Sequence, residues 1–130
     1  MGDFSVSDAD MRHEIDRGAL ELYWDALIAG KDKEAVQCYA EDAVQHLPQD
    51  GQKITGRTSI AAHGLLAPGE RLVKVNSIIG NGRLWISECE TLHHEQVMLL
   101  VSIVEMLGGR IIAETRYRAP RHISARAAAG

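Results

Sequence analysis

Apolar residues recur at spacings of three and four positions in the first third of the chain. They are Met11, Ile15, Ala19, Leu22, Tyr23, Ala26 and Leu27. This period predicts a long amphipathic helix. Ser7 and Asp10 can begin the helix with a capping box, and Gly30 can end it. Asp32 and Thr58 stand where they can cap two shorter helices, the second of which is expected over residues 60–66.

The rest of the sequence has the shorter period of β-strands. Apolar and β-branched runs predict a short strand at 43–47 and longer strands at 72–79, 83–92, 97–106 and 110–118. Asn81-Gly82 and Gly108-Gly109 are typical of tight hairpin turns. Helices followed by an antiparallel sheet predict an α+β domain in which the helices cover one sheet face. We expect one domain over residues 1–120 and a flexible tail over 121–130.

The predicted strand 97–106 is apolar on both of its faces. Val97, Leu99, Val101 and Ile103 alternate with Met98, Leu100, Val104 and Met106. One face can pack on the helices, and the other also needs cover. A second copy of the chain is the simplest source of that cover, so we expect a homodimer through the sheet face. A sheet that curls enough to bury both faces by itself is the alternative.

The composition narrows the classes of partner. The chain has 130 residues, of which 45% are hydrophobic, and a formal net charge of −4. That charge offers no basic surface to nucleic acid or to an anionic membrane, and no apolar run approaches the roughly 18 residues of a membrane span. The polar, acidic start is not typical of a signal peptide. Cys38 and Cys89 do not have the spacing of a metal motif. We therefore expect a cytoplasmic protein with reduced thiols and no nucleic-acid or membrane partner.

Charge falls in an unusual pattern on two of the predicted strands. Because strand side chains alternate between faces, one face of 83–92 carries Leu84, Ile86, Glu88, Glu90 and Leu92, and one face of 110–118 carries Ile112, Glu114, Arg116 and Arg118. Large aliphatic residues mixed with a few charges are typical of a cavity that is apolar at depth. An exposed ladder of ion pairs is the alternative, and Ile86 and Ile112 weigh against it.

These residues make candidates for acid–base chemistry. Two partly buried glutamates with an arginine nearby have their pKa values pushed apart. Glu90 is therefore the candidate that moves a proton, while Glu88 and Arg116 set its charge state and Arg116 can stabilise an oxyanion. His46, which shares a face with Val44, can assist as a proton shuttle.

Other residues are candidates to contact a ligand or are set aside. Tyr23, Trp24 and Leu27 could line the mouth of a pocket from the first helix, although aromatic residues at helical spacing are more often part of the core. Ligand contacts are also expected from Val44, Ile86, Ile112 and Glu114. His93-His94-Glu95 suits a hairpin connection better than a metal site, since adjacent residues there point apart. The sequence has no glycine-rich phosphate loop and no Cys-x-x-Cys or His-Glu-x-x-His motif, so we expect neither a metal nor another cofactor.

Three segments resemble the nuclear transport factor 2-like cone fold. Tyr39-Ala-Glu-Asp-Ala-Val-Gln-His-Leu-Pro48 is similar to the family's turn from second helix to first strand. Gly56-Arg57-Thr58-Ser-Ile60 resembles the start of its third helix, and Gly109-Arg-Ile-Ile-Ala-Glu-Thr-Arg-Tyr117 its final hairpin. The resemblance covers about residues 10–119 and is strongest to the SnoaL-like polyketide cyclases and the limonene-epoxide hydrolases. It implies a cone-shaped, curved antiparallel sheet with three N-terminal helices on its concave face.

The epoxide-hydrolase pattern can be placed on this sequence. The Tyr and Asn before the proline fall on Val44 and His46, the Arg and catalytic Asp on Glu88 and Glu90, and the second Asp on Arg116. Glu90 alone keeps the chemistry of its counterpart, because positions 88 and 116 have charges of reversed sign.

Three functions follow as hypotheses. The first is a cofactor-independent acid–base enzyme, of isomerase, cyclase, dehydratase or hydrolase type, that acts on a small and mostly apolar molecule in the cone. The second is a non-catalytic small-ligand-binding or accessory protein of the same fold. The third is a dimeric protein-interaction module. Fold alone does not decide among them, because one fold hosts many chemistries.

Overall fold

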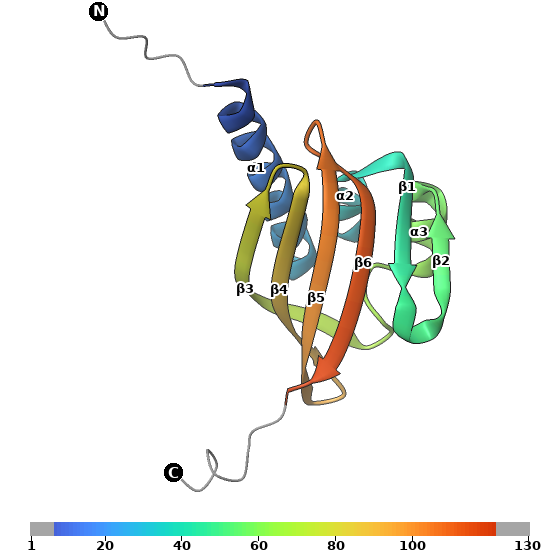
Figure 1. Ribbon diagram of the computed structural model, residues 1–130. Coiled ribbons are helices and arrows are strands. Elements are labelled where there is room, and N and C mark those ends of the chain that lie inside the picture. The colour runs from blue at the N-terminus through green and yellow to red at the C-terminus, as the bar shows by residue number, and fades with distance from the viewer. Residues whose placement is uncertain (1–6, 122–130) are drawn as a thin grey trace, which may run out of the picture.

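Three helices lie against one face of a six-stranded sheet (Figure 1). The computed structural model describes residues 7–121. The helices are α1 (Asp8–Ile28), α2 (Asp32–Val36) and α3 (Arg57–His63), with a short 3-10 helix at Pro48–Asp50. The strands are β1 (Tyr39–Leu47), β2 (Gln52–Thr55), β3 (Glu70–Asn81), β4 (Leu84–His93), β5 (Gln96–Leu107) and β6 (Arg110–Pro120). The α+β class and the three helices on the concave face are as expected from the sequence.

The sheet has the strand order β2-β1-β6-β5-β4-β3. Neighbouring strands are antiparallel except β1 and β6, which run parallel, so the sheet is mixed rather than wholly antiparallel as expected. The cause is that β1 pairs with the last strand of the chain. This pairing sets Gln45 of β1 beside Glu114 of β6, two residues far apart in the sequence.

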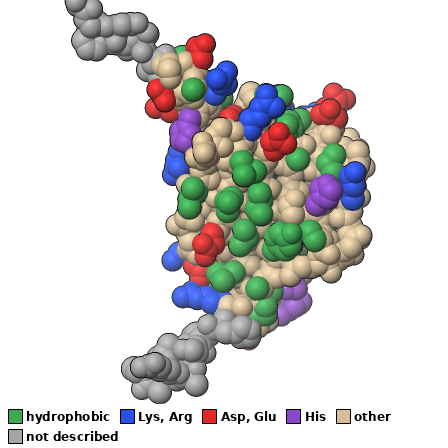
Figure 2. Space-filling view, in the orientation of Figure 1, with side chains coloured by type: hydrophobic (Ala, Val, Ile, Leu, Met, Phe, Trp, Pro, Cys, Tyr) green, Lys and Arg blue, Asp and Glu red, His purple; other side chains and the backbone are tan. Residues whose placement is uncertain are grey.

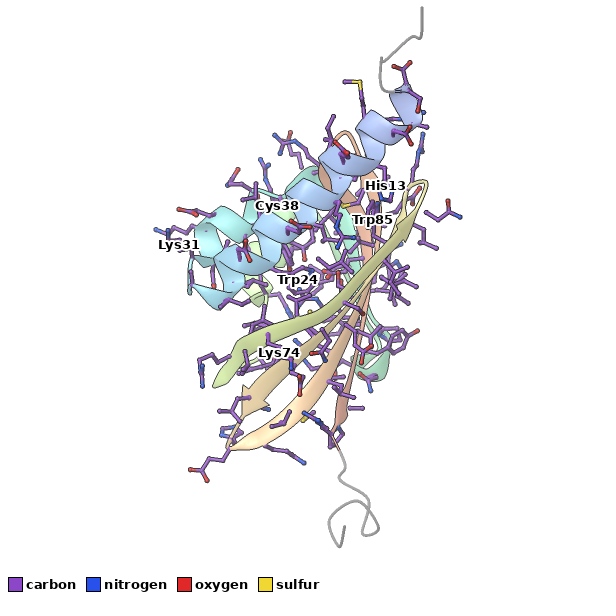
Figure 3. All side chains as sticks on the ribbon, turned by 90° about the vertical axis from the view of Figure 1, so that its left-hand side faces the viewer. His13, Trp24, Lys31, Cys38, Lys74 and Trp85 are labelled. Atoms are coloured by element: carbon purple, nitrogen blue, oxygen red, sulfur yellow. The ribbon has the colours of Figure 1, made fainter. Side chains whose placement is uncertain are left out.

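The core lies between α1 and the concave face of the sheet. Leu20 and Trp24 of α1 are buried there with Trp85 of β4 and Leu100 of β5, and Figure 3 shows both tryptophans between the helix and the strands. Trp85 lies so close to β3 that a Cβ on Gly80 would come within 2.2 Å of its ring. Core packing is therefore the role of the two tryptophans.

Most of the turn and cap signals are confirmed, with small shifts. Ser7 caps α1 by accepting the Asp10 N–H at 3.1 Å, and Gly108 and Gly109 form a tight turn with φ of 59° and 77°. The turn after β3 falls one residue later than Asn81-Gly82, because β3 includes Asn81 and β4 begins at Leu84. The helix assigned to 60–66 instead starts at Arg57, and no side chain caps it.

Membrane spans, disulfides and metal-ligating groups can be assessed only within residues 7–121. No helix between residues 7 and 121 is long and apolar enough to cross a membrane. Within the same residues Cys38 and Cys89 are unpaired thiols, and no group of three metal-ligating side chains occurs. Most of the tail expected over 121–130 lies outside the described residues.

Candidate functional site

A buried carboxylate occupies the centre of the cone. Glu114 is 1% exposed, and its Oε1 accepts hydrogen bonds from Tyr39 Oη at 2.5 Å and Gln45 Nε2 at 2.8 Å. Its Oε2 accepts from Ser102 Oγ at 2.5 Å and from Arg116 Nε at 2.8 Å. We call these five residues together with Tyr23 the Glu114 cluster.

The sheet register explains how these residues meet. Glu114 and Arg116 alternate onto the inner face of β6, and Ser102 of β5 pairs directly with Arg116. Gln45 comes from the parallel partner strand β1. Tyr23 reaches the cluster from α1, and its hydroxyl lies 2.8 Å from that of Tyr39. Residues from four elements thus converge on one ion pair.

Arg116 is held in place from several sides. It is 2% exposed, and its Nη2 donates to Tyr23 Oη at 2.5 Å while Nη1 donates to the carbonyl of Leu65. Its guanidinium also lies over the ring of Trp24, 5.9 Å from the centroid. Trp24 is fixed in turn by donating its Nε1–H to Ser87 Oγ at 2.9 Å.

The charges of the cluster follow from burial and from the ion pair. Burial alone would raise the pKa of Glu114, but the Arg116 charge and the hydrogen bonds from Ser102 and Tyr39 lower it below its usual value. Burial disfavours the charged form of Arg116, and the Glu114 charge more than offsets this, so its pKa is raised. Burial raises the pKa values of Tyr23 and Tyr39. The centre therefore holds one ionised pair and two neutral phenols.

A cavity of about 260 Å³ opens beside Arg116. We call it the Arg116 pocket. It is lined by Gln45, Leu47, Asp50, His63, Gly64, Leu65, Leu66, Ala67, Pro68, Arg116 and Arg118. Its wall is apolar along the segment from Leu65 to Pro68. The polar part of the wall comes from Gln45, Asp50, His63, Arg116 and Arg118. Arg118 is held by Glu70, whose Oε1 lies 2.9 Å from its Nη2.

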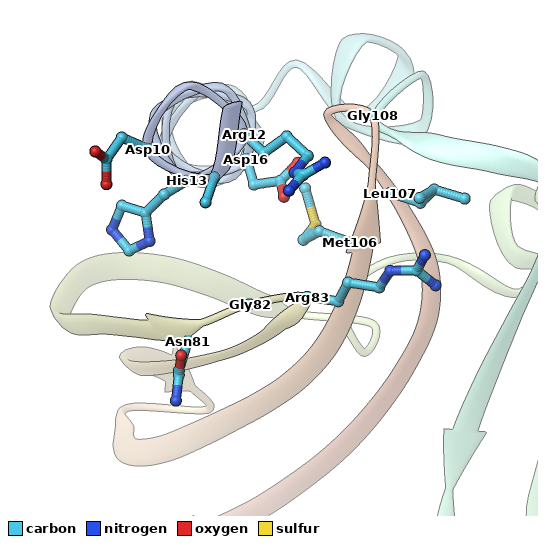
Figure 4. Close-up of a pocket in the computed structure, with 11 residues that line it drawn as sticks. Asp10, Arg12, His13, Asp16, Asn81, Gly82, Arg83, Met106, Leu107 and Gly108 are labelled. Carbon is cyan, nitrogen blue, oxygen red and sulfur yellow. The ribbon is translucent and has the colours of Figure 1, made fainter. Parts of the chain in front are cut away.

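A larger cavity of about 680 Å³ lies at the N-terminal end of α1 (Figure 4). This α1 cleft runs between the first turns of α1 and the β3–β4 and β5–β6 hairpins. Of its ionisable groups, only Asp16 is buried, and it accepts the Gly109 N–H at 2.9 Å. The ring of His13 lies against that of Trp85, with centroids 4.7 Å apart and planes tilted by 40°. Since Arg12 and Arg83 are exposed, this cleft has no buried ion pair of the kind found at Arg116.

Solved structures provide the relatives of this chain. An NTF2-like protein of unknown function from Burkholderia xenovorans LB400 is 31% identical, with a TM-score of 0.77 over 92% of this chain and 94% of that one. This chain belongs to the nuclear transport factor 2-like (NTF2-like) family. A Kribbella flavida protein provisionally assigned as a ketosteroid isomerase is 22% identical, with a TM-score of 0.75 over 85% of this chain and 82% of its own. A Xanthomonas campestris protein provisionally assigned as a polyketide cyclase is 20% identical, with a TM-score of 0.66 over 80% and 90%. These last two likenesses concern the fold. No family model and no curated protein matches the chain.

The expectation that His46, Glu88, Glu90 and Arg116 share one cavity of this NTF2-like protein is wrong. The inner face of β4 carries Trp85, Ser87, Cys89 and Thr91, all fully buried. Glu88 and Ile86 therefore lie on the outer face, as do His46 and Val44 of β1. Glu90, also on the outer face, lies against Lys74 Nζ at 3.5 Å and Arg121. The prediction took the residues with even numbers in strand 83–92 as the inner face. Because side chains alternate, this error exchanged the inner and outer positions of every residue in the strand.

The other predicted residues lie in α1 and in the inner strand β6. Arg116, Glu114 and Tyr23 come together in the Glu114 cluster. Trp24 stacks on Arg116, and Leu27 is part of the core. Ile112 is half-buried at an irregularity in the pairing of β6 with its neighbours, between Ile111 and Ala113.

Some residues of the NTF2-like site were not predicted as site residues. Ser102 stands between Val101 and Ile103, Gln45 follows Val44 in β1, and Tyr39 follows the second helix. A buried amide and hydroxyl need hydrogen-bond partners, so these polar residues beside apolar ones were the available signal. His63, at the end of α3, also lines the pocket.

Proposed function

We propose that this NTF2-like protein is a cofactor-independent acid–base enzyme that acts on a small, mostly apolar carbonyl compound in the Arg116 pocket. Arg116 would donate hydrogen bonds to the carbonyl oxygen and stabilise negative charge as it develops there. His63 at the pocket wall would accept or return the proton. The apolar wall from Leu65 to Pro68 would contact the rest of the molecule.

One observation carries this proposal. A fully buried arginine, fixed by a carboxylate on one side, lines an open cavity on the other. Its position is set before any ligand arrives, so it needs little rearrangement to meet a developing oxyanion. Such preorganisation in a cavity that combines apolar and polar walls is characteristic of enzyme sites for small molecules.

The proton carrier must come from outside the Glu114 cluster. Both oxygens of Glu114 already accept two hydrogen bonds, and the hydroxyls of Tyr23 and Tyr39 bond to each other. His63 is exposed and has one ring nitrogen 3.1 Å from Gln52 Oε1. It can therefore exchange protons with solvent without breaking the buried network.

The structural neighbours support the reaction class only in general terms. One is provisionally assigned as a ketosteroid isomerase and another as a polyketide cyclase. Those assignments concern other proteins, and both are consistent with proton transfer on carbonyl compounds by this chain.

The test is exchange of α-protons in D₂O, followed by NMR with cyclohexanone and 2-cyclohexenone as probes. The wild type should accelerate exchange, and His63→Gln should lower the acceleration by about 100-fold or more. Asp25→Asn, at an exposed position of α1 away from the pocket, is the control and should change nothing. A probe that binds in the pocket and exchanges no faster than in buffer would contradict the proposal.

A second candidate function is binding without turnover. It is favoured by the hydrogen bonds that already engage Glu114, Tyr23 and Tyr39, because they leave no acid or base of the cluster free to transfer a proton. Tight retention of a molecule through purification, with no exchange of its protons, would support this candidate over the enzyme.

We also propose that two copies of the chain pair through the outer face of the sheet. Apolar side chains gather on this face in Figure 2, and Ile79, Leu84 and Ile86 are 66%, 54% and 40% exposed. Glu88 lies on β4, while His46 and Lys53 lie on β1 and β2 towards the other edge. A face-to-face pairing with two-fold symmetry can bring the acid of one copy against the bases of the other.

Light scattering after size exclusion tests this pairing. The wild type should have twice the 14.3 kDa mass of the chain, and Ile86→Lys should have the single mass. Leu22→Lys is the matched control, because Leu22 is 68% exposed on α1 rather than on the sheet. A wild type of 14.3 kDa at micromolar concentration would contradict the dimer.

A further inference from the structure

An amide oxygen inside the Glu114 cluster has no hydrogen-bond partner. Gln45 is 1% exposed and donates its Nε2–H to Glu114, while its Oε1 is buried and meets no donor among residues 7–121. Exchanging the two ends of the amide would set its oxygen against the Glu114 carboxylate, so the orientation is fixed. A buried acceptor without a donor is costly and calls for an explanation.

Arg116 has the opposite property. A guanidinium has five N–H groups, and three of them meet Glu114, Leu65 and Tyr23. The other two find no acceptor within the described part of the chain. Gln45 and Arg116 both line the Arg116 pocket. Two residues that line the pocket therefore differ in what they lack: Gln45 has an acceptor without a donor, and Arg116 has donors without an acceptor.

Glu114 holds both residues in place. It accepts from Gln45 through Oε1 and from Arg116 through Oε2, so one buried carboxylate fixes the relative position of the two side chains. It also balances the arginine charge. A carboxylate ligand would gain little from Arg116 and would set its own oxygen against Gln45 Oε1.

We propose that Gln45 and Arg116 select a neutral ligand group that has an acceptor oxygen beside an O–H or N–H donor, such as a carboxamide or a hydroxyketone. This inference rests on the pocket of the proposed function and names the class of molecule it takes. Arg116 donates to the ligand oxygen, and the ligand donates to Gln45 Oε1. Gln45 is thus the residue that determines specificity, while the apolar wall accepts the carbon skeleton.

The test compares three probes that differ in one group. Benzamide has both the acceptor and the donor, acetophenone has the acceptor alone, and benzoate is an anion. NMR titration of the wild type should give a dissociation constant for benzamide about threefold to tenfold lower than for acetophenone. Benzoate should bind more weakly than benzamide. Equal affinities, or tighter binding of benzoate, would overturn the inference.

Two variants locate the effect. Gln45→Met keeps the side-chain length but removes the acceptor, so it should abolish the preference for benzamide over acetophenone. Leu66→Met changes the apolar wall of the same pocket and should keep that preference. A preference that persists in a folded Gln45→Met protein would assign it to another group. The wild-type comparison decides the matter alone if that variant does not fold.

These results are separable from those for the enzyme. Selective binding of benzamide without α-proton exchange on the ketones would uphold the inference and reject catalysis. Exchange that proceeds with no selectivity among the three probes would do the opposite.

Discussion

Replacing Glu114 by Gln should destabilise the protein strongly, because it leaves a buried cation without its partner. At the 2.8 Å separation of Arg116 Nε and Glu114 Oε2, Coulomb's law with an effective dielectric constant of about 20 gives about 6 kcal/mol of attraction. Desolvation of both ions offsets part of this. Breaking a buried pair by removing one charge costs about 3–5 kcal/mol, which is a large share of a domain's stability. We expect a loss of that size.

The assay is urea unfolding at fixed protein concentration, followed by tryptophan fluorescence. Glu14→Gln is the matched control: the same substitution at an exposed position of α1 should change the free energy of unfolding by less than about 0.5 kcal/mol. A loss below about 1 kcal/mol for Glu114→Gln would refute the claim that the pair is buried and ionised.

The pH dependence of stability tests the same pair. The pKa of Glu114 is lower in the folded protein than its ordinary value, so the unfolded chain takes up the proton first as the pH falls. The stabilisation is therefore complete above the unfolded pKa of about 4.3 and is lost as the pH falls through the folded pKa. Glu114→Gln should lack this part of the acid destabilisation. An unchanged acid slope in the variant would contradict the reasoning.

Two further predictions concern packing and thiol reactivity. Gly80→Ala should destabilise the protein by more than about 2 kcal/mol, because the new Cβ would lie 2.2 Å from the Trp85 ring. Gly18→Ala in α1 has no atom within 4 Å of the new Cβ and should stabilise the protein by about 0.5–1 kcal/mol. Thermal unfolding measures both changes, and equal shifts of the two melting temperatures would contradict the packing at Gly80. Burial raises the pKa of Cys89 to about 12, whereas Cys38 is only half-buried. Cys38 should therefore react first with a chromogenic thiol reagent at pH 8. The rate of colour release in single-cysteine variants measures this, and faster reaction of Cys89 would refute the prediction.

Local patterns predicted the elements well because their causes are local. The spacing of apolar residues, the Ser7 cap and the Gly108-Gly109 turn each act within a few residues, and each is present in the structure. Alternation along β6 also placed Glu114 and Arg116 together on one face, as observed.

Which residues of β4 lie on the same side of the sheet as Glu114 of β6 is a non-local question, because β5 separates the two strands. A shift of one residue exchanges the faces, and the sequence pattern favoured the face with Glu88 and Glu90. Trp85 and Cys89 belong to residue types that are commonly buried, and they mark the true inner face. The position of Gln45 depends on the parallel pairing of β1 with β6, which no local signal specifies.

Mapping where benzamide binds tests the central claim most directly. In a ¹⁵N-labelled protein, backbone and side-chain NMR shifts on titration should concentrate at Gln45, Arg116 and the segment 63–68, which line the Arg116 pocket. The alternative binding site is the α1 cleft. Shifts concentrated at His13, Asp16 and Arg83 instead would show that the buried pair is structural and that the functional site lies at the other end of the helix.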